Sequence, residues 1–101
     1  MEWKIPQEKL PKEGKGCLIR LEDKEIALFC CKGSYYAISD TCTHEGGPLS
    51  EGELEGSVVT CPWHGWQFDV ETGKCQNLIG EDVESFKVEK RADGYYLIAS
   101  S

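Results

Sequence analysis

Both histidines of this 101-residue chain follow closely behind a cysteine. The two segments are Cys42-Thr43-His44 and Cys61-Pro62-Trp63-His64, with sixteen residues between His44 and Cys61. Thiolates and imidazoles are good ligands for iron and zinc, so the four side chains are candidates for one metal site. A mixed set of two cysteines and two histidines is typical of a [2Fe–2S] cluster. The pattern predicts that Cys42 and Cys61 bind one iron, that His44 and His64 bind the other, and that the chain carries single electrons.

Two other interpretations of these four residues are open. They could bind a structural zinc ion in an interaction module without redox activity, or they could be core and loop residues that bind nothing. Zinc sites usually pair like ligands within each half, whereas each half here is mixed. A zinc protein would also be colourless. Because the sequence shows no acid/base constellation, we expect an electron-transfer component rather than an enzyme acting alone.

The charge balance narrows the choice of partners. The chain has 18 acidic and 11 basic residues, a formal net charge of −7. Nucleic acids and anionic membranes attract basic proteins, so neither is an expected partner. Redox partner proteins with a basic docking surface are expected instead. Four glutamates near the first Cys/His segment form either a docking patch or an ordinary solvated face: Glu45, Glu51, Glu53 and Glu55.

The cellular location decides whether the remaining cysteines are expected to form disulfides. Met1–Pro6 does not resemble the start of a signal peptide, and no apolar stretch reaches membrane-spanning length, so a cytoplasmic location is expected. Disulfides are rare in such a reducing compartment. We therefore predict that the four cysteines outside the metal motifs are small apolar residues in or beside the sheets. Adjacent strand residues point to opposite faces, so one of Cys30 and Cys31 should be more exposed. The four cysteines are Cys17, Cys30, Cys31 and Cys75.

The elements expected to position the metal motifs are short strands. No segment has sustained helical periodicity, and the pattern predicts one all-β domain, 1–101, of stacked antiparallel sheets forming a sandwich or partly open barrel. Short connections make the second to fourth strands a meander, and Asp93-Gly94 marks a hairpin. A small cluster-binding subdomain, about 39–66, interrupts the framework, which resumes at Gln67. The expected strands are Trp3–Ile5, Cys17–Leu21, Ile26–Cys31, Tyr35–Ile38, Val58–Thr60, Gln67–Val70, Phe86–Lys90 and Tyr95–Ala99.

Together these motifs resemble the Rieske iron–sulfur domain. The residues that carry the resemblance are Cys42-Thr43-His44, Gly46, Leu49, Cys61-Pro62-Trp63-His64-Gly65, Phe68-Asp69 and Thr72-Gly73. The resemblance implies stacked sheets with the cluster at the tip of the subdomain and both histidines at the exposed edge. It also implies a Rieske-type ferredoxin that passes electrons from a flavin reductase to the terminal oxygenase of an aromatic-ring dioxygenase system. The alternative within the family is a small subunit of a larger reductase, such as nitrite reductase.

Departures from the family pattern concern the reduction potential. High-potential members carry a disulfide at the positions of Gly47 and Trp63, and present Ser and Tyr hydroxyls where this chain has Trp66 and Phe68. Losing hydrogen bonds to sulfur lowers the potential. We predict a value towards the bottom of the range of roughly −150 to +300 mV. Trp63 should brace the two loops by packing, and the third loop, Gln76–Asp82, lacks the proline that is usual there.

Overall fold

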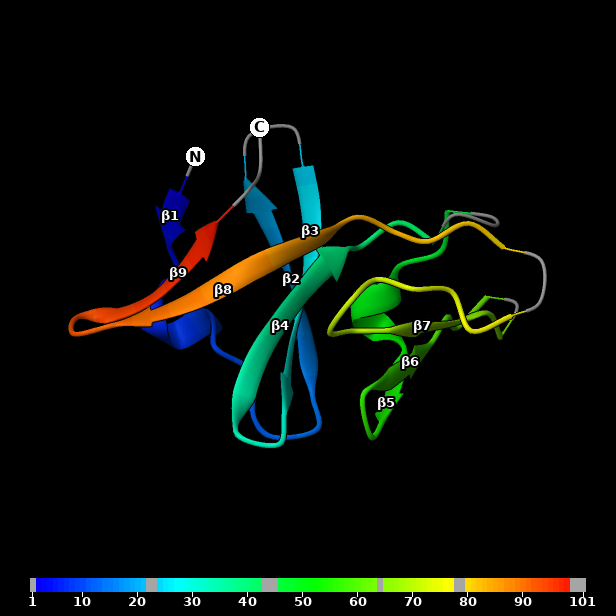
Figure 1. Cartoon of the computed structure of the whole chain (residues 1–101), viewed down its shortest axis with the longest axis horizontal. Coiled ribbons are helices and arrows are strands. Elements are labelled where there is room, and N and C mark those ends of the chain that lie inside the picture. Colours follow the sequence, from blue (N-terminus) through cyan, green and yellow to red (C-terminus); the bar gives the residue numbers. More distant parts are fainter. Residues whose placement is uncertain (1, 22–23, 43–45, 64, 78–79, 99–101) are drawn as a thin grey trace.

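The computed structural model describes residues 2–21, 24–42, 46–63, 65–77 and 80–98, in two antiparallel sheets (Figure 1). The larger one, here called the framework sheet, has the strand order β1-β9-β8-β4-β3-β2, and the small sheet has the order β5-β6-β7. This confirms the predicted all-β class. The strands are β1 (Glu2–Lys4), β2 (Gly16–Leu21), β3 (Lys24–Cys31), β4 (Ser34–Ser39), β5 (Glu53–Glu55), β6 (Val58–Thr60), β7 (Gln67–Asp69), β8 (Ser85–Arg91) and β9 (Gly94–Ile98). Two single-turn 3₁₀ helices, η1 (Gln7–Lys9) and η2 (Leu49–Glu51), were not predicted.

The predicted meander is confirmed, with β3 pairing antiparallel to both β2 and β4. Every residue of β3 from Ile26 onward is buried. Ile26 and Leu28 belong to one core cluster and Ala27 and Phe29 to the other, as expected when alternate side chains of a strand point to opposite faces. One strand therefore supplies both cores. β3 begins at Lys24, two residues before the predicted strand Ile26–Cys31.

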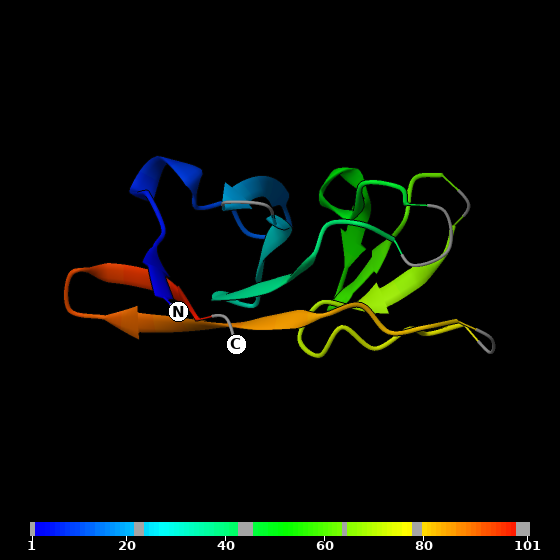
Figure 2. The same ribbon diagram turned by 90° about the horizontal axis from the view of Figure 1, so that it is seen from above.

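The cluster that contains Ile26 and Leu28, here called the first core, lies inside the curl of the framework sheet. The cluster that contains Ala27 and Phe29, here called the second core, joins that sheet to the small one. Figure 2 shows the curl from above, with the small sheet at the far end of the long axis. The second core, which holds the residues around the candidate site, consists of Ala27, Phe29, Ile38, Cys42, Leu49, Val59, Cys61, Phe68, Val70, Cys75 and Val83.

The hairpin turns follow from residues that tolerate positive φ. Cys31 pairs with Ser34, which leaves Lys32 and Gly33 as a two-residue loop with φ of 53° and 78°. Positive φ at both positions is typical of the type I′ turn that suits strand twist. The Glu13 carboxylate accepts hydrogen bonds from the Lys32 and Gly33 amides at 2.7 and 2.8 Å, and these bonds lower the pKa of Glu13.

The hairpin between β8 and β9 is also confirmed. Its loop is Ala92-Asp93, because Arg91 pairs with Gly94, and Gly94 begins β9.

The small sheet contains two departures from the sequence-based prediction. β7 pairs with β6, Val59 opposite Phe68, so Gln67–Val70 does not resume the framework as expected. β5 was not predicted, because its sequence Glu-Leu-Glu has weak strand propensity and only Leu54 is half-buried. Both β5 and β7 pair with β6, and this pairing depends on contacts between separate segments. Only β6 itself, with its β-branched residues, has a clear strand pattern in the sequence.

The cysteines outside the metal motifs are mostly core residues, as predicted. Cys30, Cys31 and Cys75 are buried and Cys17 is half-buried. The expectation that one of Cys30 and Cys31 is more exposed was wrong, because the central strand β3 is covered on both faces. All six cysteines lie within the described residues, and none of them forms a disulfide. No helix in the described parts of the chain is long and apolar enough to cross a membrane.

Candidate metal centre

The first Cys/His segment opens a tight backbone loop. The amide of Cys42 donates a hydrogen bond to the Gly47 carbonyl at 2.9 Å, and the amide of Gly46 donates to the Cys42 carbonyl at 2.8 Å. Gly46 has φ of 76°, a conformation that glycine adopts without steric cost. The loop therefore closes on itself within six residues.

The second segment repeats this geometry. The amide of Cys61 donates to the Trp66 carbonyl at 2.7 Å, and the amide of Gly65 donates to the Cys61 carbonyl at 3.0 Å. Gly65 also has φ of 76°. Each cysteine thus begins a loop with the same two hydrogen bonds and a left-handed glycine four residues later. The two cysteines occupy equivalent positions in two equivalent loops, as a two-loop site requires.

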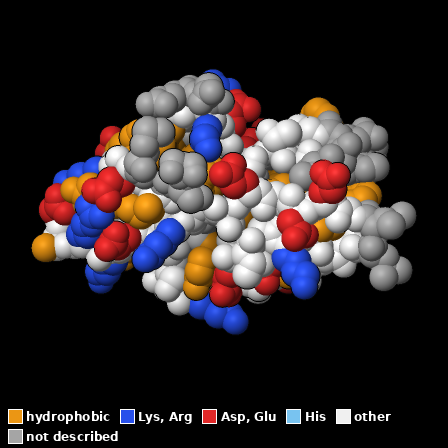
Figure 3. Space-filling view, turned by 45° about the horizontal axis from the view of Figure 1, so that its top comes forward, with side chains coloured by type: hydrophobic (Ala, Val, Ile, Leu, Met, Phe, Trp, Pro, Cys, Tyr) orange, Lys and Arg blue, Asp and Glu red, His pale blue; other side chains and the backbone are white. Residues whose placement is uncertain are grey.

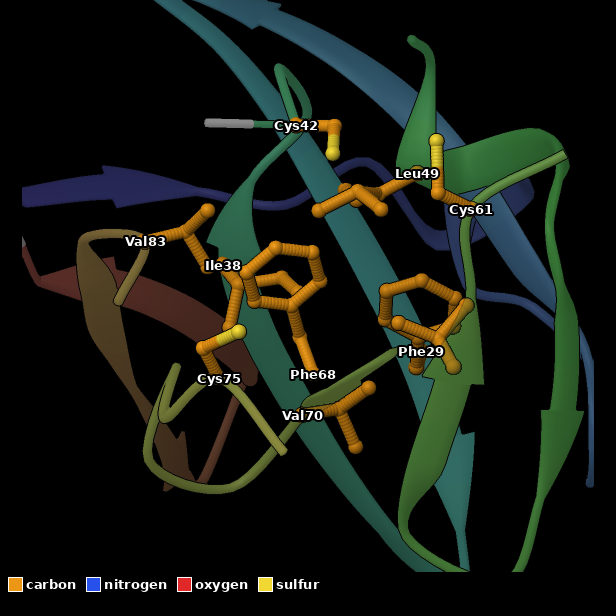
Figure 4. Close-up of a cluster of buried hydrophobic side chains, with 11 residues drawn as sticks. Phe29, Ile38, Cys42, Leu49, Cys61, Phe68, Val70, Cys75 and Val83 are labelled. Atoms are coloured by element: carbon orange, nitrogen blue, oxygen red, sulfur yellow. The ribbon is translucent and has the colours of Figure 1, made fainter. Parts of the chain in front are cut away.

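Both cysteine side chains face the second core, with exposed fractions of 3% for Cys42 and 2% for Cys61. Figure 4 shows their thiols at the same end of that core, beside Leu49, with Cys75 at the other end. Two buried thiols from two loops supply the thiolate half of a Cys₂His₂ donor set. Cys75 is not brought to the same end, in line with the prediction that it is a small apolar residue in or beside the sheets.

The two loops touch at Gly47. An ideal Cβ on Gly47 would lie 2.7 Å from Cys61 Sγ and 3.0 Å from the Trp63 ring, so only glycine fits against the second loop. The positions at which the resemblance places a disulfide, 47 and 63, are therefore neighbours here. Trp63 makes the expected contact across the loops, and 57% of its surface remains exposed.

His44 and His64 lie outside the described residues, so their predicted roles stay predictions. The described residues on their own contain no group of three or more His, Cys, Asp or Glu side chains that could hold a metal ion. The described thiols still fit the cluster, because both cysteines open loops with the same hydrogen bonds and both are buried at one end of the second core. The donor chemistry is complete only with both imidazoles.

The third loop is held without proline. The Asn77 side-chain oxygen accepts a hydrogen bond from the Gln67 amide at 2.9 Å, and Asp82 accepts one from the Cys75 amide at 2.8 Å. Gly80 packs so closely on the Trp66 ring that a Cβ there would overlap it. These positioning residues were missed. The presence of Asn77 and Asp82 in a turn-rich segment could have indicated this role, because Asn and Asp side chains often accept hydrogen bonds from backbone amides.

The thiols of Cys30 and Cys31 are buried in β3, away from the two cysteine loops. Burial raises the pKa of both thiols above the ordinary value. Cys31 Sγ donates a hydrogen bond to the Gly56 carbonyl at 3.1 Å. Protonated, hydrogen-bonded thiols in a strand agree with a packing role.

The carboxylates near the site are solvent-facing. Glu51, Glu53 and Glu55 are exposed, and no ion-pair partner for them is found among the described residues; Glu45 lies outside those residues. Their charges are therefore directed into solvent.

The fold and the site define a class: a small all-β metalloprotein whose two equivalent loops offer buried cysteines at one end of a shared core. The Rieske [2Fe-2S] domain model matches residues 3–87. The chain therefore belongs to the Rieske [2Fe–2S] family, and the cofactor of that family is a [2Fe–2S] cluster. This confirms the predicted family and cofactor and overturns the zinc interpretation.

The chain is similar to ferredoxins of dioxygenase systems. The chain is 39% identical over 79 residues to the ferredoxin component of the naphthalene 1,2-dioxygenase/salicylate 5-hydroxylase systems of a Ralstonia species, covering 76% of this chain and 75% of the relative. The ferredoxin of carbazole 1,9a-dioxygenase from Nocardioides aromaticivorans superposes with a TM-score of 0.86 at 26% identity, covering 99% of this chain and 98% of that one.

A chain in the complex of reduced oxygenase and oxidized ferredoxin of carbazole 1,9a-dioxygenase superposes with a TM-score of 0.84 at 31% identity, covering 94% of this chain and 99% of that one. Ferredoxins transfer electrons for a partner enzyme and are not the enzyme. The predicted class, an electron-transfer ferredoxin, is confirmed.

Proposed function

We propose that this protein accepts single electrons from a flavin reductase and delivers them to the terminal oxygenase of an aromatic-ring dioxygenase-type system. The observation that carries the proposal is the likeness, over nearly the whole of both chains, to ferredoxins of such systems. The two equivalent cysteine loops supply the site that this role needs. Stable co-purification with a large reductase subunit would instead favour the alternative of a reductase subunit.

We propose Cys42, His44, Cys61 and His64 as the ligands. When bound, the cluster supplies reversible one-electron exchange. The chain would hold it through the two buried thiols, which exclude water from the sulfur side, and the two imidazoles, which would face the partner. The glycines at the loop ends keep the backbone close, so that amide N–H groups can point at sulfur.

The test of the ligand assignment is spectroscopic. The purified protein should contain iron and acid-labile sulfide, and after reduction with dithionite it should give a rhombic EPR signal with an average g well below 2. Cys42→Ser and Cys61→Ser should lose the cluster. His64→Cys should lower the potential and shift the visible spectrum, because a thiolate adds negative charge. Cys31→Ala is the matched control and should keep the spectrum. An unchanged spectrum in His64→Cys would exclude His64 as a ligand.

The test of the physiological role is reconstitution. With the reductase and oxygenase of a naphthalene dioxygenase system and their own ferredoxin omitted, this protein should restore NADH-dependent product formation. Cys61→Ser should not. A protein that holds the cluster, is reduced by the reductase and leaves the oxygenase without electrons would contradict the proposed acceptor.

We further propose a low reduction potential, a single domain over 1–101 with the cluster-binding part at about 39–66, and a cytoplasmic location. Trp66 and the buried Phe68 offer no hydroxyl to sulfur, which supports the low potential. Redox titration should give a midpoint towards the bottom of roughly −150 to +300 mV, and a midpoint well above zero would contradict this. Reduced thiols suit the reducing cytoplasm, and cell fractionation tests the location.

A further inference from the structure

Trp63 is an exposed aromatic side chain that lies against the other cysteine loop. It stands out as the large hydrophobic side chain that the described structure leaves exposed, at 57%. It follows Pro62 and lies against Gly47 of the other loop, where a Cβ would meet its ring at 3.0 Å. An indole held by backbone contacts loses little entropy on binding, and tryptophans of this kind are enriched among the residues that dominate protein interfaces.

The charge of the molecule is divided unevenly along its long axis. Residues 40–83 contain nine carboxylates and one lysine, a net charge of −8, and the rest of the chain carries +1. In Figure 1 the described residues between 40 and 83 fill one end of the molecule, whose longest extent is 40 Å. The end with Trp63 is therefore strongly negative, and the end built from the framework strands is nearly neutral.

Ion pairing strengthens this division. The ion pairs between described residues all join residues outside 40–83, for example Arg91 with Glu2 at 2.7 Å and Lys24 with Glu84 at 3.7 Å. On the face drawn in Figure 3, most Lys and Arg side chains lie over that framework end. The exposed carboxylates Glu51, Glu53 and Glu71 have no such partner among the described residues, so their field extends into solvent.

We propose that Trp63 is the apolar anchor by which the acidic end docks onto a redox partner whose lysine- and arginine-rich surface surrounds an apolar depression. This rests on the proposed function as an electron carrier. The net charge of −8 would steer the end of the molecule that carries the site towards a basic surface, and Trp63 would then be desolvated in the complex. A second copy is disfavoured as the occupant, because it would bring two acidic ends together.

Horse cytochrome c, a basic haem protein, is a suitable probe of the docking surface. One electron would pass from the reduced protein to the ferric haem, which is followed by haem absorbance. At low ionic strength, hydroxyl-radical labelling of Trp63 should fall several-fold when cytochrome c is added, and labelling of Trp3 in β1 should not change. Complex formation without protection of Trp63 would overturn the proposal, as would the absence of a complex. Protection in the protein alone at rising concentration would identify a second copy as the occupant and would also overturn it.

Matched variants separate charge from the aromatic anchor. Glu51→Gln/Glu53→Gln/Glu71→Gln should slow cytochrome c reduction about tenfold at low salt and remove most of its salt dependence. Glu2→Gln/Glu8→Gln/Glu89→Gln, with the same change of net charge in β1, η1 and β8 at the framework end, should have little effect. Trp63→Ala should weaken binding roughly tenfold or more, whereas Trp63→Phe should retain most of it. Equal effects of the two triple variants would contradict a specific docking end.

Measurements on the cluster distinguish a failure of the proposed function from a failure of the docking inference. Iron content, visible spectrum and midpoint potential should be unchanged in Trp63→Phe and in both triple variants. If the wild-type protein holds no cluster, the proposed function fails. If every variant holds the cluster and reduces cytochrome c at the wild-type rate at low salt, the proposed function stands and the docking inference alone is wrong.

Discussion

At the scale of single residues, Gly47 decides how closely the two cysteine loops can approach. Its missing side chain leaves space that Cys61 Sγ and the Trp63 ring occupy. These contacts join residues fourteen and sixteen positions apart in the sequence, so they fix one loop relative to the other rather than shaping either loop. A side chain at this position should therefore disturb the site before it disturbs the sheets.

Gly47→Ala should lower the cluster content per chain and destabilise the fold by about 1–3 kcal/mol, because a Cβ would lie 2.7 Å from Cys61 Sγ. Iron and sulfide assays with denaturant unfolding measure both effects. Gly56→Ala is the control. Its Cβ meets no atom within 4 Å, so it should cost only about 1–2 kcal/mol of left-handed backbone strain and keep full cluster content. Equal cluster loss in both variants would refute the steric explanation.

Glu13 should make stability depend on pH on the acid side. Hydrogen bonds from the Gly33 and Lys32 amides lower its folded-state pKa below the ordinary 4.5. Its contribution is therefore fully present above pH 4.5 and is lost as the pH falls through the lower folded-state value. In Glu13→Gln the deficit relative to wild type should be largest near pH 6 and should shrink below pH 4.5. Unfolding midpoints against pH measure this, with Glu8→Gln as control, and a deficit independent of pH would contradict it.

At the scale of elements, the third loop is fastened to the small sheet by side-chain oxygens. Asp82 accepts the hydrogen bond of the Cys75 amide, and Asn77 accepts that of Gln67 at the start of β7. Cys75 also forms an isolated antiparallel bridge with Phe68, so the start of the loop pairs alongside β7 at the edge of the small sheet. Removing one oxygen should release the loop without unfolding the framework sheet.

Asp82→Ala should destabilise the protein by about 1–3 kcal/mol, because the amide of the buried Cys75 loses its acceptor. Hydrogen exchange should rise in residues 75–77 and stay unchanged in β3. Glu84→Ala, which removes only an exposed ion pair with Lys24, should change stability by less than about 1 kcal/mol. Unchanged exchange at Cys75 in Asp82→Ala would contradict the proposed fastening.

At the scale of the whole molecule, two cores share the central strand β3. Ile26 and Leu28 face the core of the framework sheet, whereas Ala27 and Phe29 face the core that includes Cys42. The two parts of the chain are therefore coupled through one strand. The cluster ligands proposed here belong to only one of these cores, so the effect of losing the cluster should be graded across the molecule.

Removing the metal with a chelator under anaerobic conditions should loosen β5, β6 and β7 more than β2, β8 and β9. Metal binding to a folded site adds to the free energy of folding. The small sheet has only the three-residue strands β5, β6 and β7, so it should lose more stability than the framework sheet when the metal is removed. Hydrogen exchange of the apoprotein measures the gradient, and reconstitution with iron and sulfide should reverse it. Uniform loss of protection over both sheets would show that the framework does not fold without the cluster.

What the sequence determined by itself was local. The types and spacing of Cys42, His44, Cys61 and His64 indicated the cofactor, and the short connections between the second to fourth strands indicated the meander. These signals act within a few residues, through ligand spacing and backbone conformation. The family assignment followed from the same short motifs.

The tertiary structure decided which distant segments meet. It paired β7 with β6, buried both faces of β3, placed Gly47 against the second loop and left Trp63 exposed. It also gathered an acidic segment at one end of the molecule. The physical reason is that strand pairing and burial depend on which surfaces the folded chain covers, and no short stretch of sequence contains both partners of such a contact.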